Sequence, residues 1–201
     1  VDPRHIDCTK KFASQVKFDP ATRNVSGYVA GLAFPDLDEN DPNFADKLIW
    51  NNYLSGGWPR SQFQYFPKFG YVMVDEKRGF DRSRMWGFLR TFMAGRLDEP
   101  YIQDEGKTYY EQFLLAIEPF DIRGVGSYRI RYMGGERQDD GWVYVKSMRR
   151  TRRISGGAWF DPIGGTDQLN DEISNYSAYP TWYPKYKYLG KKLILACQQG
   201  R

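Results

Sequence analysis

Four of the five residues at 149–153 are arginines, and they directly follow a strand-like run at 142–146. Guanidinium groups bind phosphate and carboxylate through paired hydrogen bonds, so a cluster of this kind can hold an anion. Side chains alternate along an extended strand. We therefore expect Arg150 and Arg152 to share one face, and the other face to carry Arg149, Thr151 and Arg153.

The arginine cluster allows three interpretations. Arg150 and Arg152 could bind the polar headgroup of a ligand, or the cluster could dock onto an anionic membrane or partner. The four arginines could instead pair with nearby acids or stay solvated, as surface charges commonly do. The nearby acids are Asp161, Asp167, Asp171 and Glu172.

Those four acids offer the oxygen ligands that calcium prefers, but their spacing does not fit the twelve-residue EF-hand loop, and the nearby arginines neutralise them. We predict no metal site. His5 is the single histidine, so a Ser-His-Asp or Cys-His arrangement would depend on it. No local spacing nominates a pair of carboxylates for glycoside hydrolysis. We predict a non-enzymatic protein with no catalytic residue and no cofactor.

Aromatic residues make up 17% of the 201-residue chain, whereas the mean hydropathy is only -0.68. Amphipathic rings therefore carry much of the apolar surface, and they suit half-exposed strands and wet clefts. The 29 basic and 25 acidic residues give a formal charge of +4, too small an excess to indicate a nucleic-acid partner. No apolar run reaches the roughly 18 residues of a membrane-spanning helix, so we expect peripheral membrane contact at most.

Alternating hydrophobicity predicts strands at 25–34, 84–96, 107–118, 128–132, 142–146 and 192–197. A polar segment at 133–141 predicts a hairpin loop, and the whole pattern favours an antiparallel meander. A helix is expected to start at Asp41-Pro42, run through Trp50 and stop before Ser55, because an N-capping residue precedes proline at the first helical position. A second short helix is expected near 171–176.

A mainly antiparallel sheet with one or two helices must bury one face. Two arrangements satisfy this requirement. One is a packed β-sandwich. The other is a strongly curved sheet whose concave side is lined by rings and partly plugged by helices, which leaves an apolar cavity. The candidates for lining that cavity are Trp86, Phe88, Phe92, Phe113, Trp142 and Tyr144. For each single ring the alternative is ordinary core.

Several ordered motifs carry a family resemblance. The first block runs from Gly31 to Pro35, then Asp41-Pro42, then Ile49-Trp50-Asn51. The second block comprises the arginines at 149–153, the segment Asp-Pro-Ile-Gly-Gly-Thr-Asp at 161–167 and the run at 186–192. Together they resemble a bacterial envelope family known as a domain of unknown function, number thirteen twenty-nine, over about residues 25–197.

That family resembles, more distantly, the periplasmic lipoprotein carriers LolA and LolB. The resemblance implies a mainly β (α+β) fold, in which a curved antiparallel sheet forms an incomplete barrel with one or two helices as plug or lid. It therefore favours a cavity for acyl chains over the packed sandwich. It also implies a periplasmic or outer-membrane-associated location in a Gram-negative envelope, with an outer-membrane or transporter protein as a candidate partner.

We expect a single domain over residues 1–201 that lacks native segments at both ends, since the resemblance implies further chain before Val1 and after Arg201. The expected function is non-enzymatic binding or carriage of a lipid, a lipoprotein acyl chain or another hydrophobic ligand, with Arg150 and Arg152 at its polar head. The alternative is an envelope scaffold or partner-docking module without a small ligand, which would expose an apolar patch or a strand edge.

Two cysteines, Cys8 and Cys197, stand near opposite ends of the chain. Because the termini of a domain often lie close together, these cysteines could form a disulfide in an oxidising compartment. Two separate thiols are the alternative, and the sequence leaves both open. It contains no Cys/His cluster of the kind that holds structural zinc.

Overall fold

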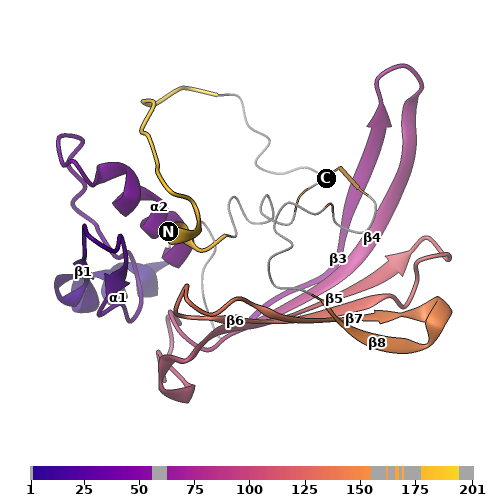
Figure 1. Cartoon of the computed structure of the whole chain (residues 1–201), viewed down its shortest axis with the longest axis horizontal. Coiled ribbons are helices and arrows are strands. Elements are labelled where there is room, and N and C mark those ends of the chain that lie inside the picture. Colours follow the sequence, from indigo (N-terminus) through magenta and orange to yellow (C-terminus); the bar gives the residue numbers. More distant parts are fainter. Residues whose placement is uncertain are drawn as a thin grey trace.

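The structure is a computed structural model of the chain, and it describes residues 2–55, 63–154, 162, 166–167, 169 and 178–194. Within these residues the chain is mostly β with two α-helices. Its main element is a curved, six-stranded antiparallel sheet that does not close into a barrel (Figure 1). The predicted mainly β fold with a curved, unclosed sheet is confirmed.

The six strands of the sheet follow one another in chain order, and each is antiparallel to the next. This is the predicted meander, in which every connection joins neighbouring strands. The strands are β3 (Phe63–Asp75), β4 (Gly79–Phe92), β5 (Thr108–Glu118), β6 (Gly126–Tyr132), β7 (Asp140–Val145) and β8 (Arg150–Ile154).

The remaining elements precede the sheet, lie in its connections or follow its last strand. Before the sheet come α1 (Pro3–Phe12), η1 (Ala13–Gln15), the paired short strands β1 (Lys17–Phe18) and β2 (Val25–Ser26), and α2 (Phe44–Ser55). Three short 3-10 helices follow, η2 (Asp104–Gly106), η3 (Lys146–Met148) and η5 (Pro180–Trp182). No helix among the described residues is long and apolar enough to cross a membrane.

Both α-helices begin where an aspartate satisfies free backbone N–H groups. At α1, Asp2 is the N-cap and its Oδ1 accepts a hydrogen bond from the backbone N–H of Arg4 at 3.0 Å, with Pro3 at the first helical position. Before α2, Oδ1 of Asp41 accepts from the backbone N–H of Asn43 at 2.8 Å. The predicted helix after Asp41 is therefore present, although it begins at Phe44 and extends to Ser55.

The register of the strands decides which side chains share a face, because residues directly opposite each other point to the same side. One row across all six strands consists of Phe66, Phe88, Leu114, Ser127, Val143 and Arg152. The adjacent row, on the opposite face, consists of Tyr65, Leu89, Phe113, Tyr128, Trp142 and Arg153.

Helix α2 identifies the concave side of the sheet. Phe92 and Tyr110 lie on the same face as Phe88, and they share a buried cluster with Trp50 and Tyr53 of α2. In Figure 1 this helix stands above the inner curve of the sheet, at one end. We call the face that carries Phe88 the concave face and the face that carries Phe113 the convex face.

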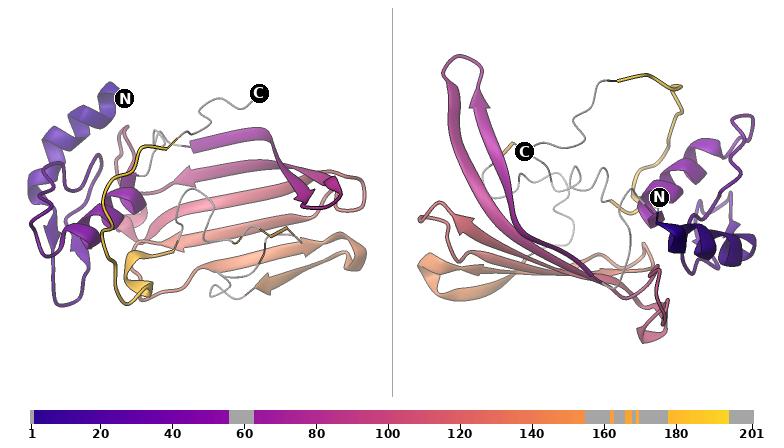
Figure 2. Two further views of the ribbon diagram at one scale, coloured as in Figure 1. Left: turned by 90° about the horizontal axis from the view of Figure 1, so that it is seen from above. Right: turned by 180° about the vertical axis from the view of Figure 1, so that it is seen from behind.

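The main buried core lies where the helices meet the sheet, at one end of the molecule (Figure 2). Its centre is a set of aromatic rings from α2, β4, β5 and the C-terminal segment. Tyr53 and Tyr109 have ring centroids 5.4 Å apart, and the hydroxyl of Tyr109 donates to the carbonyl of Tyr53 at 3.1 Å. Tyr179 packs edge-on against Trp50 at 5.2 Å. Segment 178–194 thereby holds α2 against the sheet.

Some predicted elements differ from the structure. The strand expected at 25–34 is shortened to Val25–Ser26, because Gly27 and Gly31 adopt positive φ angles of 73° and 83°, which interrupt extended pairing. Residues 192–194 form no regular element, and 195–197 lie outside the described residues, as does the helix expected near 171–176. Strand β3 and helix α1 were not among the predicted elements.

Cys8 lies buried in a small cluster with Phe12, Ala30 and Leu97. Its thiol donates to the carbonyl of Leu97 at 3.9 Å, and burial raises the pKa of this thiol. Cys197 lies outside the described residues, so a disulfide between Cys8 and Cys197 stays a prediction.

Candidate ligand-binding site

The sheet register separates the rings that were expected to line one cavity. Trp86, Phe88 and Phe92 lie on the concave face, opposite Ala116, Leu114 and Tyr110 respectively. The three others lie on the convex face, where Phe113 is 41% exposed and Tyr144 is 40% exposed. The prediction that all six rings line one cavity is therefore wrong, because three of them lie on each face of the sheet. The convex residues are Phe113, Trp142 and Tyr144.

The concave face carries an apolar floor, which consists of Phe66, Phe69, Trp86, Phe88, Leu114, Ala116, Val143 and Val145. Its rings contact one another: Phe66 and Phe88 have centroids 5.8 Å apart, and Phe69 and Phe88 meet edge-on at 6.3 Å. Trp86 and Phe88 are buried, whereas Phe66, Phe69 and Leu114 are half-buried. Part of this apolar surface therefore stays accessible.

Phe92 has a different place from the other two concave rings. It lies at the end of β4 and is 1% exposed. Its ring packs edge-on against Tyr109 and Tyr110, with centroids 6.2 and 6.1 Å away. It therefore belongs to the core between α2 and the sheet, beyond the end of the apolar floor.

A row of polar residues borders the apolar floor on the side of α2. In register across four strands it consists of Gln64, Arg90, Gln112 and Arg129, and it ends at Gly141 and Ile154, which are not polar. Arg90 is 8% exposed, and its Nε and Nη2 both donate to Oε1 of Gln112, at 3.2 and 2.7 Å. Its guanidinium also lies over the ring of Tyr110, 4.3 Å from the centroid.

The next row toward α2 contains a buried arginine that forms an ion pair. Arg131 is 2% exposed, and its Nε and Nη2 donate to the two carboxylate oxygens of Asp139 at 2.8 and 2.9 Å. Arg129 lies 3.7 Å from the same carboxylate. The paired geometry is the strong, charge-assisted form of an Arg–carboxylate contact. It fixes β6 to the start of β7.

The side chains of the arginine-rich strand β8 lie on the faces that their alternation predicts. Arg150 and Arg152 lie opposite Val145 and Val143 on the concave face, and both are exposed. Neither forms an ion pair with a described residue. Thr151 and Arg153 lie on the convex face, whereas Arg149 precedes the strand with a positive φ of 50°.

Arg153 pairs with Asp140, an acid that was not among its expected partners. Tyr132 and Arg137 donate to the same carboxylate at 2.8 and 3.0 Å. The hydrogen bond from Arg153, together with these two, lowers the pKa of Asp140 from its ordinary 3.8 to about 2. Of the acids that were expected to pair with the cluster, Asp161, Asp171 and Glu172 lie outside the described residues, and Asp167 is exposed.

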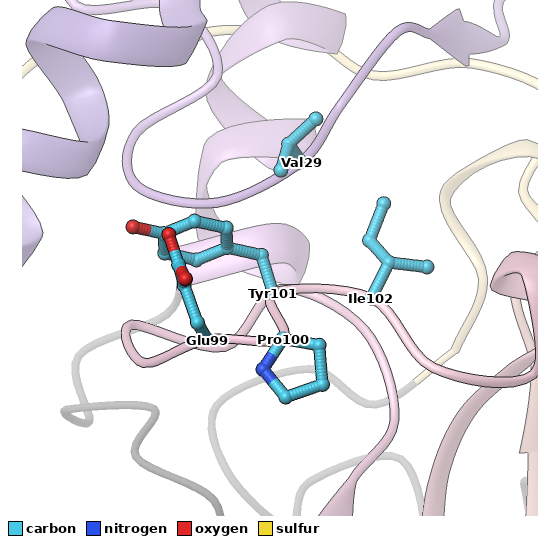
Figure 3. A pocket seen from close by; sticks show the side chains of 5 residues that line it. All are labelled: Val29, Glu99, Pro100, Tyr101 and Ile102. Atoms are coloured by element: carbon cyan, nitrogen blue, oxygen red, sulfur yellow. The ribbon is translucent and has the colours of Figure 1, made fainter.

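A shallow pocket of about 580 Å³ lies elsewhere, against the loop that connects β4 to β5 (Figure 3). Its lining consists of Val29, Glu99, Pro100, Tyr101 and Ile102. None of the predicted ligand-binding residues contributes to it, and it holds one carboxylate and no cation. The described residues include no group of three or more His, Cys, Asp or Glu side chains that could hold a metal ion.

Comparison with known proteins identifies the family of this chain. The family model described as "Protein of unknown function (DUF1329)" matches residues 1–199. The chain belongs to the DUF1329 family. This confirms the family resemblance of its motifs. Comparison with curated proteins gives no match.

Two solved structures resemble this DUF1329 chain. One is a DUF1329 family protein from Desulfovibrio piger, with 23% identity and a TM-score of 0.43, over 56% of this chain and 42% of the solved chain. The other is a candidate outer membrane lipoprotein-sorting protein domain from Vibrio parahaemolyticus, with 15% identity and a TM-score of 0.41, over 55% of this chain and 40% of that one. The match spans less than half of either solved chain.

Sequence reasoning missed several residues of the concave face, above all Phe66, Phe69, Arg90 and Leu114. Arg90 stands two residues from Phe88 and two from Phe92, within an otherwise apolar stripe of period two. An arginine at such a position is the signal that could have found it, since charged residues are rarely fully buried unless they are paired.

Proposed function

We propose that this DUF1329 protein is a non-enzymatic binding or carrier protein of the bacterial cell envelope, which holds a lipid or other hydrophobic ligand on the concave face of its sheet. The observation that carries the proposal is the apolar floor, with half-buried rings and aliphatic side chains on the inner curve of an unclosed sheet. The periplasmic or outer-membrane location, and an outer-membrane or transporter partner, belong to the proposal through the family motifs.

The chemistry of the floor suits an acyl chain. Each methylene transferred from water to an apolar surface contributes about 0.8 kcal/mol, before the cost of ordering the ligand and the side chains. Phe66 and Phe69 can adjust to the ligand because they are only half-buried. Arg150 and Arg152 stand at the β8 edge of the same face, where the predicted contact with a polar head remains part of the proposal.

Leu114 and Leu115 supply a matched test, because they are adjacent in β5 and point to opposite faces. Leu114 lies opposite Phe88 on the concave face, whereas Leu115 is exposed on the convex face. Leu114→Asp is expected to weaken binding of a fluorescent acyl probe at least about tenfold, because an aliphatic contact worth about 1.5–3 kcal/mol is lost and a charge is left in its place. Leu115→Asp should stay within about twofold of the unmodified chain.

The binding constants are measured by fluorescence titration, with circular dichroism to show that both variants keep the β-sheet signal. Equal binding by both leucine variants would contradict the concave site. No binding of the probe by the unmodified chain would remove the carrier function itself.

The convex face gives one observation in favour of the scaffold alternative. It exposes a group of large apolar side chains, which includes Phe63, Tyr65, Leu89, Phe113, Leu115 and Tyr144. Exposed apolar surface of this kind is typical of docking sites. If docking rather than ligand binding is the function, Leu115→Asp will weaken capture of an envelope partner while Leu114→Asp will not.

A further inference from the structure

Arg90 is a buried cation without a carboxylate partner. No described acid lies within ion-pair distance of its guanidinium, and its hydrogen bonds go to the neutral amide oxygen of Gln112. Its Nη1 makes no hydrogen bond with the described residues. A charge withdrawn from water is costly unless it is paired, and an arginine stays charged because its ordinary pKa is above 12.

The neighbouring Arg131 is also buried, but it has a carboxylate partner. Asp139 forms a two-point pair with Arg131, and the pKa of Arg131 is raised, because Tyr110, Tyr53 and this carboxylate outweigh the opposing effect of burial. For Arg90, burial lowers the pKa more than the neighbouring Tyr110 raises it, and the nearby cations Arg131 and Arg129 also lower it. The fold therefore supplies a counter-charge to one of the two arginines and leaves the other without it.

A second donor on the same face also lacks an acceptor. The indole Nε1 of Trp86 is buried and makes no hydrogen bond with a described residue. Buried donors without acceptors are uncommon in native proteins and call for an explanation. Arg90 and Trp86 stand at either side of Phe88 in β4, so both donors border the apolar floor that the proposed function requires.

We propose that the ligand of the concave face is an acidic amphiphile, whose carboxylate or phosphate is bound by Arg90 while its hydrocarbon lies on the apolar floor. This rests on the proposed function and adds the chemical class of the ligand. Arg90 provides a charged donor held in place by Gln112 and by the ring of Tyr110, and a fixed guanidinium is the donor that best matches an oxyanion. Neutral acyl chains lack the counter-charge that this position requires.

The experiment compares three amphiphiles of equal chain length and inorganic phosphate in calorimetric titrations of the whole chain. The amphiphiles are dodecanoate, dodecyl phosphate and the neutral dodecylglycerol. The unmodified chain should bind both acidic amphiphiles at least about tenfold more tightly than the neutral one, as expected for a hydrogen bond to a charged group. Inorganic phosphate alone should bind far more weakly, because it gains nothing from the apolar floor.

Arg90→Gln should abolish the preference for the acidic amphiphiles and leave dodecylglycerol binding unchanged. Arg90→Lys keeps the charge without the guanidinium fork, and it should retain part of the preference. Arg152→Gln tests the β8 edge of the same face, where the sequence predicted contact with a polar head. Arg153→Gln removes an exposed arginine from the convex face of the same strand and is the matched control, which should keep the preference. The urea midpoint of each variant shows whether it is folded.

The outcomes distinguish the proposed carrier function from the proposed binding of an acidic head by Arg90. If no amphiphile binds, the carrier function fails together with this inference. If all three amphiphiles bind with equal affinity, or if Arg90→Gln and Arg90→Lys both keep the preference, the carrier function stands and the assignment to Arg90 is wrong. If Arg152→Gln loses the preference for acidic amphiphiles, the polar head of the ligand is bound at β8 and not at Arg90. Equal affinity for inorganic phosphate and dodecyl phosphate would show an anion site without a lipid.

Discussion

Arg131→Met is expected to lower the free energy of unfolding by about 3–5 kcal/mol, as happens when one partner of a buried ion pair is removed. Arg131 and Asp139 are each 2% exposed at the side chain, so the substitution leaves a carboxylate in a site that water scarcely reaches. Asp139→Asn should have a cost of similar size, because it leaves the Arg131 guanidinium without its counter-charge. Urea unfolding followed by tryptophan fluorescence measures both.

The pair Arg153–Asp140 provides the control, since it joins the same two residue types nearby but at the surface. The side chain of Arg153 is 70% exposed. Arg153→Met should therefore cost about 1 kcal/mol or less. The double variant Arg131→Met with Asp139→Leu should recover most of the loss, because two apolar side chains can replace a buried pair. A loss of under about 1 kcal/mol in Arg131→Met would contradict the assigned burial of the pair.

Phe92→Ala is the second substitution with a large expected effect, a loss of about 3–5 kcal/mol in the free energy of unfolding. Phe92 is 1% exposed and packs between β5 and α2, so a cavity forms at the point where the helix is held against the sheet. Leu89→Ala is the matched substitution in the same strand. Leu89 is partly exposed on the convex face, and its truncation should cost about 1 kcal/mol or less.

The two variants are compared by the same urea unfolding experiment, with acyl-probe binding measured on each. If Phe92→Ala unfolds like the unmodified chain but binds the probe poorly, Phe92 is a ligand contact, as the sequence indicated. If it unfolds easily and binds normally where it is still folded, Phe92 is a core residue, as the structure places it.

The strand pattern could be predicted from the sequence because each strand obeys its own alternation. Alternating hydrophobicity predicted a strand at 128–132, and the structure has the strand β6 over Gly126–Tyr132. The hairpin before Trp142 is also present as expected. These features depend on residues that are near one another in sequence, where a period of two is decisive.

The pairing of faces between strands could not be predicted. Alternation separates Trp86 from Leu89 within β4 and Trp142 from Val143 within β7, but it does not say whether Trp86 and Trp142 share a side. That depends on the register of three successive strand pairs, and a shift of one residue reverses the answer. The register shift between Met85 and Trp86 shows that such irregularities do occur here.

The two missed elements have local causes. Strand β3 contains Pro67, and proline within an alternating run argues against a strand, although an edge strand tolerates it. Helix α1 is short and carries few apolar residues, and only its cap, Asp2 followed by Pro3, signals its start. The buried partners of Arg90 and Arg131 come from neighbouring strands or loops, so no spacing within one segment could reveal them.

The most direct test of a concave ligand site is to locate a bound acyl chain on the protein. The chain is mixed with a dodecanoate that carries a photoreactive diazirine in its hydrocarbon, irradiated, and digested for mass spectrometry. Cross-links are expected at the apolar floor, in peptides of β3, β4 and β5 that contain Phe66, Phe88 and Leu114. Cross-links confined to Leu115 and Tyr144 on the convex face, or to Val29 and Tyr101 in the separate pocket, would contradict it.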